Sequence, residues 1–504
     1  MTLGDLMRDV TERAPFDASV VERAQLAEAK TNVTAVTYDS RQATPGSLFV
    51  ALKGLREDGS AFARDAVGRG AVAVVAEIQA PAGASVPWIQ VSDARLALAA
   101  LSASFYRNPS EKLALIGITG TNGKTTTSYV LQSIFEAAGI RCGRIGTVGY
   151  RIGSREIEAA RTTPEAPELQ RMLRDMVSQG SGGCIMEVSS HALALRRTEY
   201  LHFAAAIFTN LTRDHLDFHR DMEDYFVAKR RLFEQLPAGG FGIANHDDPR
   251  GAEFAAVAPT AVTYAIDAPA DVRSGPLTFS LDGLQFEVRT PRGPLQIRSA
   301  LVGRPNAYNI LASVATAMAL DLPFDAIERG LAALTAVPGR FEMASSPADD
   351  VRVVVDYAHT DDALKNLLET ARPLAAGRVI TVFGCGGDRD RTKRPLMGMV
   401  AARLSDVVVI TSDNPRSEDP ARIIEEAKRG AQGEVKGGGT ELLTIVDRRD
   451  AIYEAVKRAG ARDVLLIAGK GHEKYQEIGG RVLPFDDVAV AREALAARRE
   501  SRVG

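Results

Sequence analysis

The strongest chemical signal in the chain is a glycine-rich loop between an apolar run at 113–119 and a stretch with helical spacing that starts at residue 124. The loop consists of Gly120, Thr121, Asn122, Gly123, Lys124, Thr125 and Thr126. Glycines let backbone N–H groups approach phosphate oxygens, and the N-terminus of the following helix adds favourable partial charge. Lys124 is suited to the β and γ phosphates, and the Thr125 hydroxyl to Mg²⁺. The spacing therefore predicts a nucleotide phosphate site.

This loop predicts the ligand but not the reaction. A motor, a kinase, a GTPase and a ligase all remain open, and so does a glycine-rich turn without a ligand. The pattern has one departure, because Ile118 stands at the usual first glycine position and Gly117 lies one residue early. The chain contains no Asn-Lys-x-Asp sequence, which disfavours a GTPase.

Size, charge and cysteine spacing restrict the class of protein. The 504 residues are too many for one hydrophobic core and suggest about three domains. The formal net charge of −3 gives no overall attraction to nucleic acid or anionic lipid. Cys142, Cys184 and Cys385 form no CxxC pair, which argues against a zinc site or a disulfide framework. A nucleic-acid partner is therefore not expected.

Hydropathy indicates the compartment. Residues 1–17 contain acidic side chains where a signal peptide would have its apolar run. No apolar stretch of about 18 residues occurs, so we expect no membrane insertion. The sequence predicts a cytoplasmic protein.

The order of apolar runs predicts the fold of the first two thirds. Residues 1–110 combine short runs at 47–52 and 71–76 with a helical stretch at 93–106, which predicts a small α/β domain. In residues 111–338, the runs at 113–119, 183–188 and 203–209 are typical of buried parallel strands. Alternation around Asp282-Gly283 predicts a β-hairpin at 277–288. We expect a central P-loop-type parallel sheet with an antiparallel addition.

Residues 339–504 alternate regularly between strand-like and helical segments. The strand-like runs lie at 351–355, 379–383, 407–411, 442–446 and 464–468. Such βαβ units predict a doubly wound, Rossmann-like sheet, in which ligands bind beyond the carboxyl ends of the strands. The fold class is therefore α/β with three domains.

Motifs downstream of the loop resemble those of the Mur ligase family in order and spacing. They are Glu187-Val-Ser-Ser-His191, Asn210-Leu-Thr-Arg-Asp-His215-Leu-Asp-Phe-His219, Ala228-Lys229, Asn306-x-x-Asn309, Pro338-Gly-Arg340-Phe-Glu342 and Asp356-Tyr-Ala-His359. Each motif alone is weak, but the ordered set extends the resemblance over essentially the whole chain.

The resemblance implies an ADP-forming, ATP-dependent ligase of peptidoglycan precursor synthesis, and hence of cell-wall formation, cell shape and cell division. It implies a uridine-nucleotide substrate on residues 1–110, ATP on 111–338 and the incoming amino acid on 339–504. ATP would phosphorylate the γ-carboxylate of D-glutamate in a UDP-N-acetylmuramoyl-dipeptide, and an amine would displace the phosphate. The order is chemically sound, because a carboxylate resists an amine until it carries a leaving group.

The resemblance also implies catalytic residues. It assigns Glu187 and His215 to two Mg²⁺ ions beside Lys124 and Thr125, because cations must offset the repulsion between ATP and a carboxylate. It implies that CO2 carbamylates Lys229, since a carbamate is attracted to magnesium and an ammonium is repelled. The alternatives are a solvated glutamate, a structural histidine and an exposed helix lysine.

For the two nucleotides, the resemblance gives further contacts. ATP would be held by the loop 120–126 with Asn309, Arg340 and Asp356, the last two near a domain junction whose closure would exclude water. The uridine-linked substrate would contact Ser40, Thr162, Thr163, Ser189 and Arg197. Arg161 and Leu195 depart from the asparagine and glutamine that relatives often carry there, which affects this pocket in detail.

The amino-acid acceptor is implied by Asp413-Asn414-Pro415-Arg416, which resembles members that add meso-2,6-diaminopimelate. Arginine supplies the planar, bidentate donor that a distal carboxylate needs. The other implied contacts are Arg389, Gly469 and Glu473, with Glu473 suited to an ammonium. The alternatives are a plain turn at 413–416, a lysine-adding or folylpolyglutamate-type ligase, and a P-loop ATPase. We expect the chain to act as a monomer.

Overall fold

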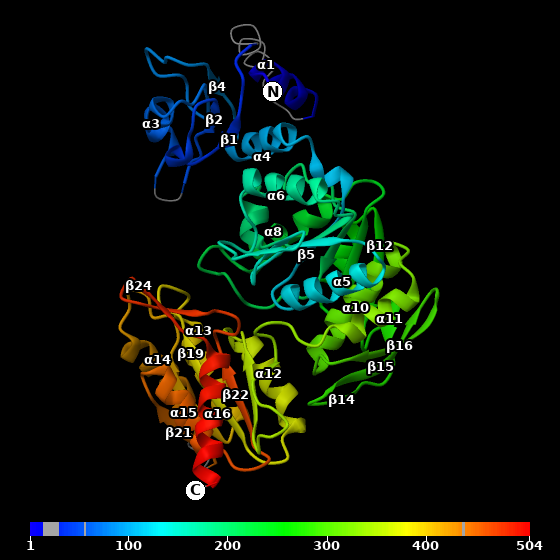
Figure 1. The fold of residues 1–504 in the computed structure, drawn as a ribbon, viewed down its shortest axis with the longest axis vertical. Coiled ribbons are helices and arrows are strands. Elements are labelled where there is room, and N and C mark those ends of the chain that lie inside the picture. The colour runs from blue at the N-terminus through cyan, green and yellow to red at the C-terminus, as the bar shows by residue number, and fades with distance from the viewer. Residues whose placement is uncertain (14–29, 55–56, 436–438, 504) are drawn as a thin grey trace.

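The computed structural model describes residues 1–13, 30–54, 57–435 and 439–503. Figure 1 shows an N-terminal, a central and a C-terminal α/β unit that follow one another along the long axis of the molecule. The larger sheets of the three units are built mainly from parallel strands, and helices cover them. This arrangement confirms the predicted α/β class.

The N-terminal unit is a parallel sheet in the order β1-β2-β3-β4. Its strands are β1 (Ala35–Thr37), β2 (Ser47–Val50), β3 (Ala73–Ala76) and β4 (Trp88–Gln90). Its helices are α1 (Leu3–Arg13), η1 (Ser40–Gln42), η2 (Gly59–Phe62), α3 (Ala63–Gly68), α4 (Ala94–Phe105) and η3 (Pro109–Lys112). Alternate residues of β2 pack to opposite sides, with Leu48 facing α1 and α4 and Phe49 facing α3.

The central sheet has the order β14-β15-β13-β12-β11-β10-β5-β9-β6-β7-β8, with β16 paired to β15. Its strands are β5 (Ala114–Thr119), β6 (Cys142–Ile145), β7 (Tyr150–Ile152), β8 (Arg155–Ile157), β9 (Gly183–Glu187), β10 (Ala205–Phe208), β11 (Phe241–Asn245), β12 (Thr260–Ala265), β13 (Val272–Ser274), β14 (Thr278–Ser280), β15 (Gly283–Thr290) and β16 (Gly293–Ser299). The predicted strands β9 and β10 run parallel to β5, and the predicted hairpin is β14–β15.

Helices cover both faces of the central sheet. They are α5 (Lys124–Ala137), α6 (Ala166–Ser178), α7 (Ser190–Ala194), α8 (Met222–Glu234), α9 (Gly251–Val257), α10 (Arg304–Ala319) and α11 (Phe324–Ala333). Ile116 and Ile118 of β5 pack with α5, α10 and α11, whereas Leu115 packs with α6 and α8 on the opposite face. Burial on both faces explains the continuous apolar run of β5.

The C-terminal sheet has the order β17-β18-β22-β19-β20-β21 and is parallel except for β17. Its strands are β17 (Glu342–Met343), β18 (Arg352–Asp356), β19 (Val379–Cys385), β20 (Val407–Ser412), β21 (Glu441–Thr444) and β22 (Val464–Ala468), and a separate hairpin joins β23 (Tyr475–Ile478) to β24 (Arg481–Pro484). Its helices are α12 (Asp361–Ala371), η4 (Arg372–Leu374), α13 (Lys393–Leu404), α14 (Pro420–Val435), α15 (Arg448–Arg458) and α16 (Asp487–Val503).

Core packing confirms that this sheet is doubly wound. Side chains of α12, α13 and α14 cover one face, and those of α15 and α16 cover the other. The strand order changes direction between β22 and β19, which places a topological switch point at their carboxyl ends. The loops that follow β18, β19, β20 and β22 carry the motifs predicted to bind ligands.

Candidate active site

A cavity of about 1690 Å³ lies between the central and C-terminal units. Its walls come from the loop after β5, the ends of β9 and β10, the helices α8 and α10, and the loop after β18. The predicted site residues that line it are Thr121, Asn122, Gly123, Lys124, Thr125, Thr126, Thr162, Thr163, Glu187, Ser189, Arg197, His215, Lys229, Asn309, Arg340, Asp356 and Arg389. Those that do not line it are Gly120, Ser40, Asp413, Asn414, Pro415, Arg416, Gly469 and Glu473.

The lysine of the glycine-rich loop makes hydrogen bonds to the backbone of the same loop. Lys124 Nζ donates to the carbonyl oxygens of Gly120 at 2.9 Å and Thr121 at 2.8 Å. Gly123 has a φ of +90°, and a Cβ there would clash with Asn309 Oδ1, so glycine is required at this position. Asn309 in turn accepts from Thr127 Oγ1 at 3.3 Å. Asn309 of α10 therefore packs against the loop and supports the conformation that we expect to bind a phosphate group.

Glu187, at the end of β9, has both carboxylate oxygens aimed at Thr147. Oε1 accepts from the Thr147 N–H at 3.0 Å, and Oε2 accepts from Thr147 Oγ1 at 2.9 Å. The Thr147 hydroxyl also lies 3.0 Å from Thr162 Oγ1, and Thr163 Oγ1 donates to the Glu187 carbonyl at 2.9 Å. Glu187 is only 1% exposed, so its side chain is held in the wall of the cavity and is not solvated.

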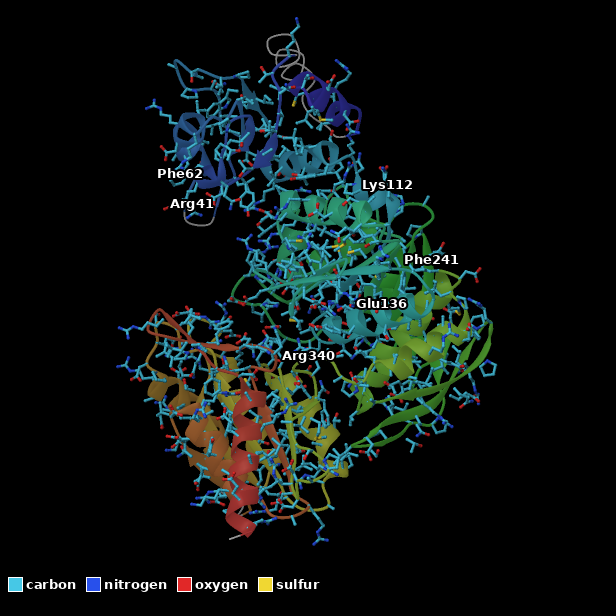
Figure 2. The ribbon with its side chains drawn as sticks, in the orientation of Figure 1. Arg41, Phe62, Lys112, Glu136, Phe241 and Arg340 are labelled. Atoms are coloured by element: carbon cyan, nitrogen blue, oxygen red, sulfur yellow. The ribbon has the colours of Figure 1, made fainter. Side chains whose placement is uncertain are left out.

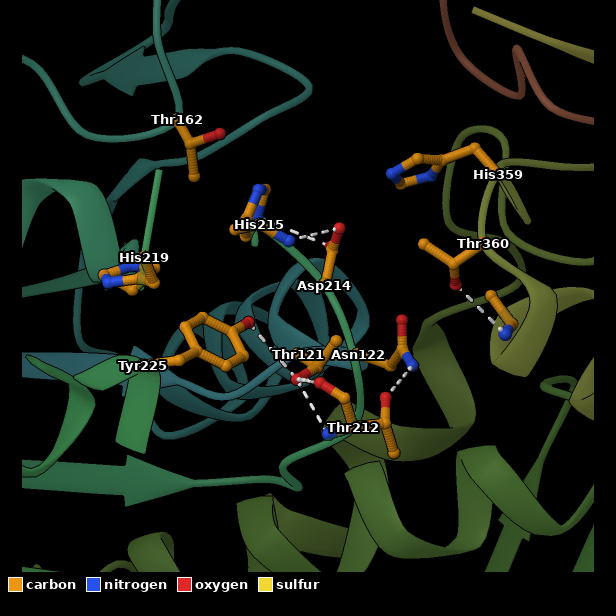
Figure 3. A network of polar contacts seen from close by, with 12 residues as sticks. Thr121, Asn122, Thr162, Thr212, Asp214, His215, His219, Tyr225, His359 and Thr360 are labelled. Atoms are coloured by element: carbon orange, nitrogen blue, oxygen red, sulfur yellow. Dashed lines mark hydrogen bonds and ion pairs between the residues drawn. The ribbon is translucent and has the colours of Figure 1, made fainter. Parts of the chain in front are cut away.

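His215 also lines the cavity and has a strained backbone conformation, with a φ of +55°. Its N–H donates to Asp214 Oδ1 at 2.9 Å, and its Nε2 lies 3.4 Å from Asp214 Oδ2, as Figure 3 shows. Burial lowers the pKa of His215 to about 3 although Asp214 opposes the shift. The imidazole is therefore neutral near pH 7, the form that can coordinate a metal.

Lys229, on α8, is buried rather than exposed. Its Nζ donates to the Gly120 carbonyl oxygen at 2.8 Å and lies 4.4 Å from the centroid of the Tyr225 ring. Burial and the neighbouring Lys124 lower the pKa of Lys229 well below its ordinary value, with only Asp214 opposing. These surroundings favour the neutral, nucleophilic form of the amine over the ammonium.

The C-terminal unit supplies the opposite wall, and Figure 2 shows Arg340 at the junction of the two units. Arg340 donates from a guanidinium N–H to Thr125 Oγ1 at 3.2 Å and lies 4.4 Å from the centroid of the Tyr357 ring. The Asp356 carboxylate accepts from the N–H groups of Phe341 at 2.7 Å and Ala358 at 2.8 Å. Asp356 thus fixes the loop that carries Arg340, and burial raises its pKa against the opposing charge of Arg340.

A second contact between the units was not predicted from sequence. Asp362, in the first turn of α12, accepts at Oδ2 from Asn122 Nδ2 at 2.9 Å and from Thr212 Oγ1 at 3.1 Å. Asn122 belongs to the glycine-rich loop, and Asp362 lies 240 residues away in sequence. No local pattern signals this pair, whereas Thr360 as N-cap of α12 is a recognisable signal for the helix start.

The residues expected to contact the uridine-linked substrate fall into two groups. Thr162, Thr163, Ser189 and Arg197 line the cavity, whereas Ser40 lies in η1 of the N-terminal unit and does not. Arg197 donates to the Thr163 carbonyl oxygen at 3.0 Å and pairs with Glu165 at 2.8 Å. Arg161 pairs with the same glutamate at 2.9 Å, which gives the unusual arginine at this position a structural role.

The residues expected to bind the amino-acid acceptor form a separate group, which we call the acceptor cluster: Asp413, Asn414, Pro415, Arg416, Gly469 and Glu473. Arg416 has a φ of +52° and donates from Nη1 to the Gly387 carbonyl oxygen at 2.8 Å. Asn414 Nδ2 donates to Glu473 Oε2 at 2.8 Å. Burial raises the pKa of Glu473 although Lys470 opposes the shift. Arg389 lines the cavity instead.

Fold and site together define a nucleotide-dependent enzyme in which a phosphate loop on one sheet faces a doubly wound sheet across a cavity. Models of known families match all three units: "Mur ligase family, catalytic domain" matches residues 32–106, "Mur ligase middle domain" 118–317, and "Mur ligase, glutamate ligase domain" 339–471. The chain belongs to the Mur ligase family, whose members are ATP-dependent ligases.

Individual relatives are similar over nearly their full length. The chain is 47% identical to the UDP-N-acetylmuramoyl-L-alanyl-D-glutamate–2,6-diaminopimelate ligase of Solibacter usitatus, with 98% of each chain covered. It is 48% identical to the Geobacter metallireducens ligase of the same name, with 92% of this chain and 93% of the relative covered.

Solved structures agree with this relationship. A structure of a ligase with that name has a TM-score of 0.67 at 34% identity and covers 93% of this chain and 95% of its own. MurF from Acinetobacter baumannii shares the fold, with a TM-score of 0.65 at 19% identity over 99% of this chain and 98% of its own. In the part of the chain that the structure describes, no helix is both long and apolar enough to cross a membrane.

Proposed function

We propose that the chain adds meso-2,6-diaminopimelate to the D-glutamate γ-carboxylate of UDP-N-acetylmuramoyl-L-Ala-D-Glu, with conversion of ATP to ADP and phosphate. The proposal rests on the position of Arg416. Its guanidinium donates to the Gly387 carbonyl oxygen within the acceptor cluster, and its side chain is 21% exposed, so a ligand can reach it. The names of relatives that are almost half identical over their full length support the same acceptor. The reaction is a step of peptidoglycan precursor synthesis.

The chemistry proceeds in two displacements. A carboxylate oxygen of D-glutamate attacks the γ-phosphorus of ATP, and the bond to ADP breaks. The acceptor amine then attacks the acyl carbon, phosphate leaves with the bonding electrons, and the nitrogen loses a proton. Lys124 already lies in the loop with Nζ on two carbonyl oxygens, so a phosphate needs only to replace those weaker acceptors.

The residues present fit Mg²⁺ shared with a nucleotide. Mg²⁺ in such sites takes one or two carboxylates together with phosphate oxygens and water. Glu187 offers a buried carboxylate, Thr125 a hydroxyl and His215 a neutral imidazole. Among the described residues there is no group of three metal-binding side chains that would cage a metal without the nucleotide. When bound, Mg²⁺ would neutralise charge between the phosphates and the substrate carboxylate.

The surroundings of Lys229 support the proposal that it is carbamylated. The neutral amine nitrogen attacks the carbon of CO2, a C–N bond forms, and the nitrogen loses a proton to give an anionic carbamate. Lys124 repels an ammonium at this position and lowers the pKa of Lys229, and it would attract a carbamate instead. The modification would therefore replace a buried neutral amine with an anion beside Lys124.

The two substrates would occupy opposite sides of the cavity. For the uridine-linked substrate we propose Ser40, Thr162, Thr163, Ser189 and Arg197. Nε of Arg197 is buried without a hydrogen-bond partner among the described residues, which suits an anionic group of the substrate. ATP would contact the loop 120–126 with Asn309, Arg340 and Asp356. We propose that the enzyme works in the cytoplasm as a monomer.

Phosphate release tests the proposal. The enzyme is supplied with Mg²⁺, ATP and UDP-N-acetylmuramoyl-L-Ala-D-Glu, and then with diaminopimelate, lysine or no amino acid. Release that requires both the uridine-linked substrate and diaminopimelate is expected. Release with the uridine-linked substrate and lysine, but not with diaminopimelate, would identify a lysine-adding ligase. Release from ATP without the uridine-linked substrate or an amino acid would identify an ATPase.

A further inference from the structure

The segment at residues 210–215, which follows β10, packs against the glycine-rich loop. The Thr121 N–H donates to the Asn210 carbonyl oxygen at 2.8 Å, and the Asn122 N–H donates to Asn210 Oδ1 at 2.9 Å. The Thr212 N–H donates to Thr121 Oγ1 at 3.0 Å, and Figure 3 shows Thr121, Asn122 and Thr212 beside one another. The loop and the segment therefore stabilise each other's conformation.

The C-terminal unit contacts both of these elements through one carboxylate of α12. Asp362 Oδ2 accepts from Asn122 Nδ2 at 2.9 Å and from Thr212 Oγ1 at 3.1 Å, so a single oxygen bridges the loop and the segment. Thr360 is the N-cap of α12, and its Oγ1 accepts from the Ala363 N–H at 3.2 Å. This cap fixes the helix turn that carries Asp362.

The charge of Asp362 strengthens the bridge. The side chain is half-buried, and burial raises its pKa, whereas the hydrogen bonds from Thr212 and Asn122 oppose this shift. Both donors belong to the central unit, and hydrogen bonds to a charged acceptor are stronger than those between neutral groups. Asp362 therefore holds Asn122 more firmly than an uncharged side chain would at this position.

A second carboxylate of the C-terminal unit contacts the next residue of the segment. Arg213 Nη2 donates to Asp390 Oδ2 at 3.2 Å and also to Thr392 Oγ1. Asp390 lies in the loop between β19 and α13, on a different element from Asp362. Two elements of the C-terminal unit thus hold adjacent residues of one segment, so a displacement of this unit would disturb both contacts together.

A phosphate-binding loop that must be ordered when its ligand binds loses affinity for that ligand. We infer that Asp362 is a positioning residue that keeps the glycine-rich loop in its ATP-binding conformation while the C-terminal unit is docked on the central unit. Separation of the units would release Asn122 and Thr212 and weaken ATP binding. The inference rests on the ATP site of the proposed function, but it does not depend on which amino acid is added.

ATP affinity tests the inference. The dissociation constant for ATP is measured by calorimetry with Mg²⁺ and without the other substrates. We expect it to rise about tenfold in Asp362→Ala and about threefold in Asp362→Asn, the scale of hydrogen bonds to a charged group. Asp361→Asn removes the neighbouring carboxylate of the same helix turn and is the matched control, which should change the constant less than about twofold.

Two further measurements separate positioning from a loss of structure. In the full reaction, Asp362→Ala should raise the KM for ATP about tenfold and the KM for the uridine-linked substrate less than about twofold. Thr212→Val removes one donor of the bridge and should weaken ATP binding about threefold. Because both residues act through one contact, the double variant should bind ATP within about twofold of Asp362→Ala alone.

Other outcomes overturn the inference. Unchanged ATP affinity in Asp362→Ala, or an equal loss in Asp361→Asn, would leave Asp362 a role in α12 only. Tighter binding in Asp362→Ala would mean that the bridge opposes the nucleotide. Additive losses in the double variant would show that Asp362 and Thr212 act separately. Failure of the unmodified protein to bind ATP would refute the ATP site of the proposed function itself, a result that needs no variant and is therefore distinguishable.

Discussion

Replacing Lys229 by methionine separates the stability of the protein from its chemistry. Lys229 is 1% exposed, its Nζ donates only to the Gly120 carbonyl oxygen, and no described carboxylate lies within ion-pair distance. Methionine keeps a side chain of similar length and removes the amine. We expect Lys229→Met to be at least as stable as the unmodified protein near pH 7, because an amine that is forced to give up its proton below its ordinary pKa of 10.5 disfavours folding.

The effect of Lys229 on stability can be measured from the pH dependence of the free energy of unfolding. Burial and Lys124 hold the pKa of Lys229 in the folded protein well below the ordinary value of 10.5. Between these two pKa values the unfolded chain binds one more proton than the folded chain, so the free energy of unfolding rises with pH. The slope is about 1.4 kcal/mol per pH unit in this window, and it is lost below the folded pKa and above 10.5. Lys229→Met should lack this contribution.

Activity should respond in the opposite way. If Lys229 carries the carbamate, its removal should lower kcat about 10²- to 10³-fold, the usual effect of losing one fixed charge at a reacting centre. The assays are urea unfolding between pH 7 and 10 in CO2-depleted buffer, and phosphate release with all substrates. Lys365→Met, at a helix lysine that is 55% exposed, is the control and should change neither.

Two results would refute this reasoning. One is a Lys229→Met variant that keeps kcat within about threefold, together with an intact mass of the unmodified protein that shows no CO2 adduct. The other is a loss of several kcal/mol on substitution, the size expected for breaking a well-compensated buried ion pair.

Three further substitutions test separate parts of the site. Arg416→Ala should raise the KM for diaminopimelate about 10- to 100-fold, since charged hydrogen bonds contribute about 1.5–3 kcal/mol, and an unchanged KM would remove Arg416 from the acceptor site. Gly123→Ala should weaken ATP binding by about 1–3 kcal/mol in calorimetry, because a Cβ would clash with Asn309. Thr147→Val should lower kcat about tenfold with little change in the melting temperature, since Glu187 loses one orienting hydrogen bond; an unchanged kcat would show that Glu187 needs no such support.

A glycine elsewhere provides the control for Gly123. Gly139 also has a positive φ, of +78°, but a Cβ there would meet open space. Gly139→Ala should therefore show the backbone strain alone and leave ATP binding unchanged. Equal effects of the two substitutions on ATP affinity would contradict the assigned clash with Asn309.

Much of the fold could be predicted because its signals are local. The apolar run before the glycine-rich loop is β5, and the following helix begins at Lys124, within the loop motif. The Asp282-Gly283 turn joins β14 to β15. In each case the periodicity or turn chemistry lies within a few residues of the element it specifies.

The contacts that complete the site could not be predicted in the same way. Thr147 reaches Glu187 across 40 residues, and Asp362 reaches Asn122 across 240. The burial of Lys229 could not be predicted from the sequence either, because the neighbouring Arg230 and Arg231 suggest an exposed helix face. These features depend on tertiary packing between segments far apart in the sequence, which propensity and spacing do not encode.

The choice of acceptor is the central claim, and the mass of the product tests it most directly. The enzyme is given Mg²⁺, ATP, UDP-N-acetylmuramoyl-L-Ala-D-Glu and equal concentrations of meso-diaminopimelate and lysine, and the uridine-linked product is weighed by mass spectrometry. We expect a single product that has gained diaminopimelate. A product that has gained lysine, or an unchanged dipeptide with ATP consumed, would contradict the account.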